Sequence, residues 1–435
     1  MNKFNLLGVV GDPILHSRSP DLYHSLLKGS KSNRYLRISA GSTSEILPAA
    51  ESLNLKGFNV TAPFKKNLLN RLEDLQPAAK EIDAVNLVIR QRNRWKGYNT
   101  DYLGVQRVFH RHNVSLSGKN ILILGAGGAA RAAAYACRKE DAASITFINR
   151  NEKNARSSAH RIKCFYTDFS AWTRLARQSD ILISCIPGPQ IRKHLKGNVF
   201  PRTILEADYK NPGLDYLQRE RDFLYLSGLE WLVYQGLSSF SLLSGSRLSD
   251  GRSKELQKLT GSIPLSEKIA LTGFMGTGKT ATGKIIAGIL GCPFLDSDQV
   301  IEKETGISVS RIFQDSGEPS FRNLEKTLIP DMLRHSGKAV FSLGGGAPLH
   351  AGVKKILNQK CLVIWLWTPW KTTQKRLSGI SRPQLAAQHK GISLKSIFHK
   401  RMIFYAETAD LVIPMEFLTP ESAARRIVNE IHSSF

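Results

Sequence analysis

The stretch GKNILILGAGGAARAAAYACR, residues 118–138, decides the fold of the first half of the chain. Residues 118–124, which end in the apolar run ILIL, predict a buried parallel strand, and the glycines after it turn directly into an alanine-rich helix. A glycine loop that opens a helix offers backbone N–H groups and the positive end of the helix dipole to an anion. We therefore expect a dinucleotide to bind at this loop.

The strand that follows the loop indicates which dinucleotide is bound. SITFINR, residues 144–150, ends in Asn149 and Arg150 where an NAD site has an acidic residue for the ribose. A cation there suits a 2′-phosphate and favours NADP over NAD, although Arg150 could also be a solvated strand end. The predicted NADP contacts are Gly125, Ala126, Gly127, Gly128, Ala129, Asn149 and Arg150.

A second phosphate loop of a different kind lies in KIALTGFMGTGKTATGKIIAGIL, residues 268–290. A short apolar strand, a GxxxxGKT loop and a helix follow one another, which is the P-loop arrangement. Backbone amides from Gly276, Thr277 and Gly278 would hold the phosphates of ATP. Lys279 would reach the β- and γ-phosphates, and Thr280 would bind Mg²⁺.

Composition limits the remaining function classes. The 435 residues are enough for about three domains, and the alternation of β-like and helical segments indicates parallel sheets covered by helices. The net charge of +25 is spread along the chain, so we expect anionic small substrates or solvated faces and no nucleic-acid partner. We also expect no membrane span and no signal peptide. The five cysteines are scattered, which suggests a reducing cytoplasm and no structural metal.

Several motifs around the first loop occur in a characteristic order. They are GDPILHSRSP (11–20), GFNVTAPFK (57–65), AVN (84–86), GYNTD (97–101) and LEWLVYQG (229–236). Together they resemble the shikimate dehydrogenase family over residues 3–246. The resemblance implies that Lys65 and Asp101 form the catalytic pair, because reduction of a ketone needs a proton donor as the hydride arrives.

The same resemblance implies the residues that bind the dehydrogenase substrate. Ser17 and Ser19 would hold its carboxylate, and the remaining contacts would be Asn59, Thr61, Asn86, Tyr209 and Gln235. The chain departs from the family at Asp83, where glycine is usual, at Glu206, where aspartate is usual, and in SCIPGP (184–189), which replaces the nicotinamide loop.

Motifs after the second loop resemble the shikimate kinase family across residues 267–435. They are FLDSD (294–298), GEPSFRNLE (317–325), LGGGA (343–347), RLSGISRP (376–383) and KRMIFYAETA (400–409). Arginine pairs both oxygens of a carboxylate at once, which suits a carboxylate clamp. Ala281 replaces a hydroxyl residue common in the family, and the lid between Arg376 and Pro383 looks short.

The kinase resemblance implies a role for each motif residue. Asp298 would hydrogen-bond the attacking hydroxyl and act as its base, and Asp296 would join Thr280 at Mg²⁺. Arg376 would pack near the adenine, and Arg382 would close over the phosphates from a mobile lid. The predicted contacts to shikimate are Asp298, Arg322, Gly344, Gly345, Gly346 and Arg401.

These features predict an α/β protein with two enzymes in tandem. We expect an α/β substrate domain (1–104 with 230–246), a Rossmann NADP-binding domain (105–229), a linker (247–266) and a P-loop kinase domain of three-layer α/β architecture (267–435). The implied reactions are NADPH-dependent reduction of 3-dehydroshikimate and ATP-dependent phosphorylation of shikimate. The alternatives are a broader dehydrogenase that uses quinate or NAD, and a regulatory protein with one decayed site. The sequence leaves open whether the chain is a monomer or a homodimer.

Overall fold

The structure is a computed structural model that describes residues 5–27, 33–195, 199–245, 266–378 and 393–434. The chain divides into two units by its internal contacts. Unit 1 comprises Met1–Pro20, Leu27–Leu55 and Gly261–Phe435, and unit 2 comprises Asp21–Leu26 and Lys56–Thr260. The predicted linker up to residue 265, and Arg382, lie outside the described residues.

Unit 2 contains a parallel sheet with the strand order β12-β11-β10-β7-β8-β9. The chain runs outward from β7 to β9 and then returns to the other side of β7 with β10, so the strand order reverses beside the glycine loop. Doubly wound sheets bind their ligands at such a reversal. The strands are β7 (Asn120–Leu124), β8 (Ser144–Ile148), β9 (Phe165–Thr167), β10 (Ile181–Ser184), β11 (Thr203–Glu206) and β12 (Leu224–Ser227).

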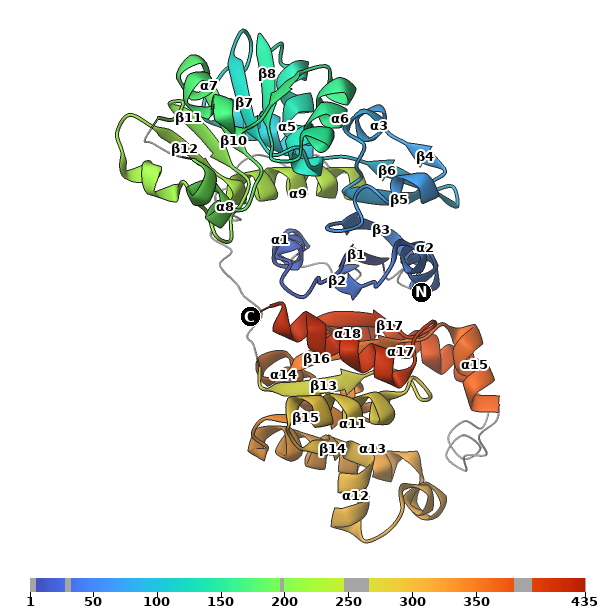
Figure 1. The fold of residues 1–435 in the computed structure, drawn as a ribbon. Helices are drawn as coiled ribbons and strands as arrows, with labels where there is room; N and C mark the ends of the chain where they lie inside the picture. Colours follow the sequence, from blue (N-terminus) through green and yellow to red (C-terminus); the bar gives the residue numbers. More distant parts are fainter. Residues whose placement is uncertain (1–4, 28–32, 196–198, 246–265, 379–392, 435) are drawn as a thin grey trace. The chain divides into compact units, whose positions relative to one another are not determined.

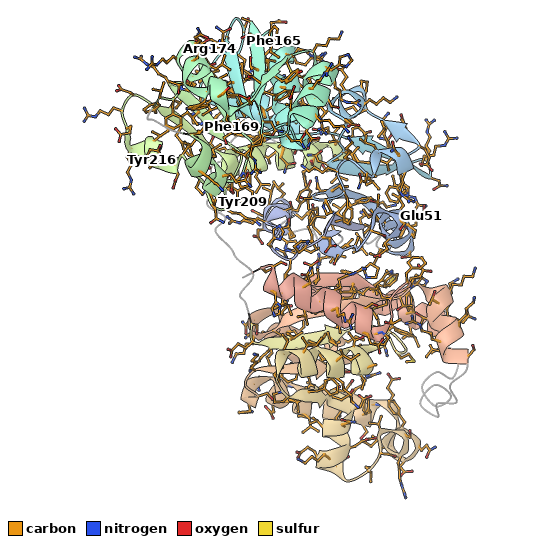
Figure 2. All side chains as sticks on the ribbon, in the orientation of Figure 1. Glu51, Phe165, Phe169, Arg174, Tyr209 and Tyr216 are labelled. Atoms are coloured by element: carbon orange, nitrogen blue, oxygen red, sulfur yellow. The ribbon has the colours of Figure 1, made fainter. Side chains whose placement is uncertain are left out.

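Helices connect these strands and cover the sheet (Figure 1). They are α5 (Gly128–Lys139), α6 (Glu152–Ile162), α7 (Trp172–Gln178) and α8 (Gly188–His194). One buried core cluster joins Leu122, Leu182 and Ile204 of the sheet to Trp172 of α7. Two large apolar side chains of this part, Phe165 and Tyr216, are exposed at its outer surface (Figure 2).

Unit 2 also contains a run of strands in the order β3-β5-β6-β4, in which β5 is antiparallel to both β3 and β6. The strands are β3 (Leu55–Val60), β4 (Asp74–Leu75), β5 (Leu87–Gln91) and β6 (Arg94–Tyr98). Helix α4 packs against α9, although the two are far apart in the sequence. The helices of this part are α3 (Pro77–Ile82), α4 (Asp101–Arg111) and α9 (Gly228–Ser244).

Unit 1 is built on parallel strands in the order β14-β15-β13-β16-β17-β2-β1. The P-loop follows β13, which is the central strand in the order β14-β15-β13-β16-β17. The strands are β1 (Asn5–Gly11), β2 (Asn33–Ser39), β13 (Lys268–Thr272), β14 (Phe294–Asp296), β15 (Ala339–Ser342), β16 (Leu362–Trp367) and β17 (Leu411–Pro414).

Several helices of unit 1 pack against this sheet, and others pack on neighbouring helices or project from it (Figure 1). The helices of this unit are α2 (Thr43–Ser52), α11 (Lys279–Leu290), α12 (Ser297–Thr305), α13 (Val309–His335), α14 (Ala351–Lys360), α15 (Trp370–Ser378), α17 (Leu394–Thr408) and α18 (Pro420–His432). Helix α1 (Ser19–Leu26) begins in unit 1 and continues into unit 2. Helix α13 is kinked at Gly317, whose φ of 76° is in the left-handed region that glycine tolerates.

The predicted α/β class, with a Rossmann sheet and a parallel P-loop sheet, is confirmed. Within the described ranges, every helix is too short or too polar to cross a membrane. The four-segment domain division stays a proposal. The units of the structure group residues 1–20 and 27–55 with the kinase segment because β2 pairs with β17, which connects the early chain to the late chain.

Candidate active sites

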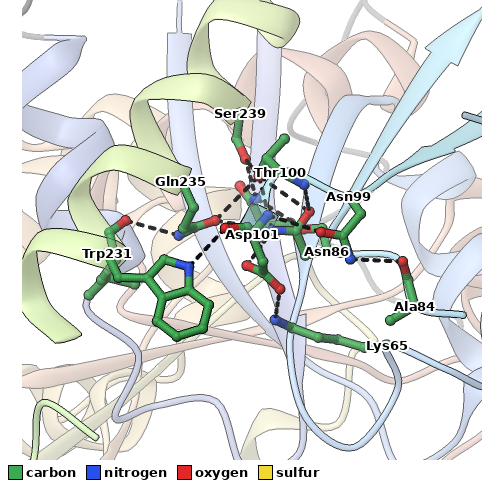
Figure 3. A network of polar contacts seen from close by, with 11 residues as sticks. Lys65, Ala84, Asn86, Asn99, Thr100, Asp101, Trp231, Gln235 and Ser239 are labelled. Atoms are coloured by element: carbon green, nitrogen blue, oxygen red, sulfur yellow. Dashed lines mark hydrogen bonds and ion pairs between the residues drawn. The ribbon is translucent and has the colours of Figure 1, made fainter. Parts of the chain in front are cut away.

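The predicted catalytic pair of the dehydrogenase forms in unit 2. Lys65 lies in the turn after β3, and Asp101 is the first residue of α4. The Nζ of Lys65 donates to Oδ2 of Asp101 at 2.7 Å, and 9% of the Asp101 side chain is exposed (Figure 3). An ammonium held by a buried carboxylate is oriented and charged, as a proton donor must be.

Asn86 completes the coordination of the Asp101 carboxylate. Its Nδ2 donates to Oδ1 of Asp101 at 2.7 Å and lies 3.1 Å from Oε1 of Gln235 (Figure 3). The backbone N–H of Thr100 donates to Oδ1 of Asn86 at 2.7 Å, which fixes the amide orientation. Both carboxylate oxygens of Asp101 are therefore occupied, and its position is set by a network of neutral groups around one ion pair.

The network extends to residues that the sequence did not single out. Ser239 of α9 lies 2.8 Å from Oγ1 of Thr100 and accepts from Asn59 at 3.2 Å. The indole of Trp231 donates to the backbone oxygen of Asp101 at 2.9 Å, and Asn99 accepts from the Asp101 N–H at 3.0 Å. Asn99 and Thr100 stand inside the quoted GYNTD motif, and Trp231 stands in LEWLVYQG, so the motifs already contained these three.

The remaining predicted substrate residues lie on separate elements. Thr61 follows β3 directly and is half-buried in unit 2. Tyr209 is half-buried between β11 and β12 (Figure 2). Ser17 and Ser19 belong to unit 1, where Ser17 ends the loop after β1 and Ser19 begins α1. The Ser17 N–H donates to the oxygen of Ile14 at 2.9 Å, which forms a tight turn.

The dinucleotide loop joins β7 to α5 as predicted. Gly125 has a φ of 100°, and a Cβ there would lie 3.3 Å from the oxygen of Cys185, so glycine is required. Gly127 is the N-cap of α5, and Gly128 and Ala129 form its first turn. A cavity of about 330 Å³ includes Ala126, Gly127 and Asn149 in its lining.

Cations that the sequence analysis missed surround that cavity. Its lining includes Lys66, Arg131 and Arg161, and the Asp83 carboxylate lies 3.1 Å from Lys66 and 3.9 Å from Arg161. The positive charge exceeds the negative charge, which fits a phosphate. Arg150 is exposed and donates to Oε1 of Gln190 at 3.2 Å. Arg131 lies within the quoted stretch 118–138 and Lys66 directly follows the quoted motif 57–65, whereas no motif contains Arg161.

Two of the family departures have structural explanations. Asp83 caps α3 with φ 57° and ψ 39°, a left-handed conformation that explains why glycine is usual there. Glu206 is fully buried and accepts from the backbone N–H groups of Gly213 at 2.6 Å and Leu214 at 3.0 Å. Burial raises the pKa of the Glu206 carboxyl, and these bonds oppose that rise.

The P-loop lies between β13 and α11. Gly278 is the N-cap of α11 with a φ of 89°, and the Thr277 hydroxyl donates to the oxygen of Phe274 at 2.9 Å. The Nζ of Lys279 donates to the oxygens of Gly273 and Phe274, both at 3.0 Å, so the ammonium lies across the loop.

The predicted Mg²⁺ ligands lie together. The Thr280 hydroxyl donates to Oδ2 of Asp296 at 2.8 Å. A hydroxyl and a carboxylate are hard oxygen ligands, which Mg²⁺ prefers, so these two residues fit the ion. On the other side of the loop, the Arg376 guanidinium donates to the oxygens of Gly276 and Met415, both at 3.2 Å.

A pocket of about 370 Å³ joins the P-loop to the predicted shikimate contacts. Arg322 and Arg401 line it from α13 and α17, and Tyr405 donates to the Gly345 oxygen at 2.6 Å. A Cβ on Gly346 would lie 2.2 Å from Nη1 of Arg322, so the glycine lets the guanidinium approach. The predicted residues that line this pocket are Gly276, Gly278, Lys279, Thr280, Asp296, Asp298, Arg322, Gly344, Gly345, Gly346 and Arg401.

Asp298 has the properties of a base in this pocket. Its Oδ1 is buried and accepts no hydrogen bond from the described residues. Burial, followed by the negative charges of Asp296 and Glu325, raises the pKa of Asp298 to about 6. A carboxylate with this pKa is ionised at neutral pH and accepts a proton more readily than an ordinary aspartate.

Glu325 is a pocket residue that the sequence analysis quoted but assigned no role. It is fully buried and pairs with Nη1 of Arg322, one helical turn before it on α13. Arg322 also donates through Nε at 3.1 Å and Nη2 at 2.8 Å to Oε1 of Glu318. The carboxylates of Glu318 and Glu325 hold the guanidinium in place. The sequence FRNLE places Arg322 and Glu325 three residues apart on a helix, which was the signal that could have predicted their contact.

These geometries define two classes of enzyme in one chain. A parallel sheet whose strand order reverses beside a glycine loop, together with the Lys65–Asp101 pair, defines a nicotinamide-dependent oxidoreductase. The P-loop with Thr280, Asp296 and an arginine-lined pocket defines an ATP-dependent phosphotransferase.

Comparisons with known proteins identify the families. The shikimate dehydrogenase substrate binding domain model matches residues 9–88, the shikimate / quinate 5-dehydrogenase model matches 106–197, and the shikimate kinase model matches 275–432. The chain belongs to the shikimate dehydrogenase family in its N-terminal part and to the shikimate kinase family in its C-terminal part.

The relatives cover each part almost completely. An NADP(+) shikimate dehydrogenase of Methanococcus maripaludis is 32% identical over 57% of this chain and 94% of its own length. A shikimate kinase of Thermodesulfovibrio yellowstonii is 38% identical over 38% of this chain and 94% of its own length. The crystal structure of shikimate dehydrogenase from Aquifex aeolicus matches with a TM-score of 0.54 and 26% identity, over 59% of this chain and 98% of its own.

Proposed function

We propose that the two sites catalyse consecutive reactions: NADPH-dependent reduction of 3-dehydroshikimate to shikimate, and ATP-dependent phosphorylation of shikimate to shikimate 3-phosphate. The chain is a bifunctional enzyme of the shikimate pathway, with NADP-dependent dehydrogenase and kinase activities. The observation that carries the residue assignments is the convergence of the predicted catalytic groups, Lys65 on Asp101 in one unit and Asp298 beside the P-loop in the other.

In the dehydrogenase, Lys65 supplies the proton. NADPH supplies the hydride when it is bound. As negative charge develops on the ketone oxygen, the Lys65 ammonium donates a proton to it and the alcohol forms. Asp101 orients the Lys65 ammonium, and Asn86 keeps Asp101 in place. Asn59, Thr61, Asn86 and Gln235 hold the substrate hydroxyls, and Ser17 and Ser19 hold the carboxylate. Tyr209 is a further substrate contact.

In the kinase, Asp298 accepts the proton of the attacking hydroxyl. Arg322 and Arg401 bind the substrate carboxylate, and the backbone of Gly344 to Gly346 borders the ring. Lys279 and the amides of Gly276 to Gly278 offset the charge on the phosphates. Thr280 and Asp296 hold Mg²⁺, which offsets further negative charge on the phosphates when it is bound.

The cationic cavity supports NADP as the dehydrogenase cofactor. Ala126, Gly127 and Asn149 share this cavity with Lys66, Arg131 and Arg161, and this charge suits a 2′-phosphate. We assign the NADP contacts to this loop and cavity and to Arg150, which follows the cavity residue Asn149 in the chain. Cytoplasmic location is part of the proposal, and the five free cysteines support it.

Two separate active sites make a simple kinetic test possible. In the wild-type chain, 3-dehydroshikimate with NADPH, Mg²⁺ and ATP should produce NADPH oxidation followed by ADP formation. Lys65→Ala should stop the first signal and restore the second only when shikimate is added. Asp298→Asn should leave NADPH oxidation intact and stop ADP formation, even when shikimate is added. Loss of both activities in either variant, with folding retained, would contradict two independent sites.

The same assay tests the alternatives. A broader dehydrogenase would turn over quinate, or use NAD, at a rate comparable with that for shikimate and NADP. A decayed site would bind its nucleotide without turnover. The Lys65–Asp101 pair, and the pocket that Lys279 and Asp298 both line, favour two working enzymes.

A further inference from the structure

A buried glutamate of the kinase segment contacts the dehydrogenase segment inside unit 1. Glu430 stands near the end of α18 and has no exposed surface. Its Oε2 accepts from the backbone N–H of Ile14 at 2.7 Å and from that of Leu15 at 2.9 Å. A buried carboxylate is costly unless it is hydrogen-bonded, so these two bonds determine where the Ile14–Leu15 backbone can lie.

The turn that Glu430 holds leads directly to Ser17. The Ser17 N–H donates to the Ile14 oxygen at 2.9 Å, so the two residues close one turn. From the opposite side, Arg37 of β2 donates to the Ser17 oxygen through Nε at 3.0 Å and Nη2 at 2.8 Å. Ile14 and Leu15 are both buried, which leaves the turn little freedom to shift.

Further contacts join the same two segments. Arg426 of α18 forms two hydrogen bonds with Glu45 of α2, at 2.7 and 3.1 Å. Arg34 of β2 contacts Glu407 of α17 at 2.6 Å, and Lys354 pairs with the same carboxylate. These ion pairs flank the β2–β17 pairing, in which Ile38 is the partner of Val412.

We propose that Glu430 is a positioning residue of the dehydrogenase: the last helix of the kinase segment fixes the turn that presents Ser17 to the substrate carboxylate. This inference rests on the proposed role of Ser17. The consequence is that substrate affinity at the dehydrogenase depends on a side chain of the kinase segment. In this fused chain, the kinase segment thus supports the structure of the dehydrogenase in addition to supplying the second enzyme.

The test compares three variants of the full chain in the oxidation of shikimate with NADP⁺. Ser17→Ala removes the proposed carboxylate contact, and Glu430→Met removes both acceptor bonds at similar volume. Each should raise KM for shikimate by roughly tenfold, the cost of one good hydrogen bond, with kcat within about twofold. Glu430→Gln keeps an acceptor oxygen, so we expect an intermediate effect. KM for shikimate should rise roughly threefold over that of the wild type.

The control is Glu421→Met, which makes the same change at an exposed position on the same helix. It should leave KM for shikimate unchanged. In all variants, KM for NADP⁺ and the kinase activity should stay within about twofold of wild type. Hydrogen exchange should also quicken at the amides of Ile14 and Leu15 in Glu430→Met, because their acceptor is lost.

The outcomes separate this inference from the role of Ser17. If Ser17→Ala raises KM while Glu430→Met leaves it unchanged, Glu430 does not position the turn and the inference is wrong. If Ser17→Ala itself has no effect, the role of Ser17 is refuted, and this inference falls with it. If Glu430→Met loses kinase activity through misfolding, Glu430→Gln decides by the same comparison with Ser17→Ala.

Discussion

The Lys65 ammonium lies 2.7 Å from Oδ2 of Asp101, while the other oxygen of that carboxylate accepts from Asn86 at 2.7 Å. Asp101 is thus held from two sides, by a charged donor and by a neutral one. The neutral donor is itself held by the Thr100 backbone N–H, so the ion pair belongs to a connected hydrogen-bond network. Rigid placement of the proton donor reduces the reorganisation needed during the reaction.

Replacement of Lys65, the proposed proton donor, should affect one activity only. We expect Lys65→Ala to lower kcat of the dehydrogenase by a factor on the order of 10² to 10⁴, the usual size of general acid–base catalysis. Kinase activity in the same sample should be unchanged. Lys56→Ala, at an exposed position on β3, is the control. An unchanged rate of ketone reduction in Lys65→Ala would remove this lysine from the chemistry.

The preference for NADP should depend on cations around the dinucleotide cavity. We expect Arg161→Gln and Arg150→Gln each to raise KM for NADPH by roughly tenfold, because a charge-assisted contact to the 2′-phosphate is lost. KM for NADH should change little, since NADH lacks that phosphate. Arg174→Gln, on α7 of the same sheet (Figure 2), is the control. Equal effects on NADH and NADPH would show that neither arginine reads the phosphate.

The carboxylate clamp of the kinase should require arginine. In Arg322→Lys, the planar fork that can pair with two oxygens is replaced by a single ammonium. We expect KM for shikimate to rise by roughly tenfold with a smaller change in KM for ATP. Arg334→Lys makes the same exchange at an exposed position on α13 and should have no effect. Equal KM for shikimate in wild type and Arg322→Lys would contradict the assignment.

The kinase should lose activity in mild acid. Burial and neighbouring carboxylates raise the pKa of Asp298 to about 6, and only the ionised form can accept the proton. Because the base is present above this pKa and is lost as the pH falls through it, kcat should fall about tenfold per pH unit below pH 6. Asp298→Asn should abolish this limb of the profile along with most of the activity. A kcat that is flat from pH 5 to 8 would be inconsistent with Asp298 as the base.

The local parts of both sites could be predicted from the sequence. The sequence predicted that the P-loop and the dinucleotide loop each lie between a strand and a helix, and the structure has β13 before α11 and β7 before α5. The resemblance to the kinase family implied that Asp298 and Arg401 contact the same substrate, and both line the pocket beside the P-loop.

Contacts between distant segments could not be predicted in the same way. Ser239 joins the Asn59 network from α9, and Arg161 faces Asp83 from α6. Neither residue carries a local signal, because the side chain that each one contacts is set by tertiary packing. The same holds for Glu430, whose partners are 415 and 416 residues away. From the sequence alone, a glutamate on an amphipathic helix is expected to face solvent. Only the fold shows that Glu430 is buried.

The most direct test of the two-site account is a crystal structure of the full chain with shikimate. The account predicts one shikimate molecule with a hydroxyl at Lys65 and Asp101, and a second with a hydroxyl at Asp298 and its carboxylate on Arg322 and Arg401. Shikimate bound at both positions would support the assignment. Its absence from either position at saturating concentration would contradict the claim that both pockets recognise the same acid.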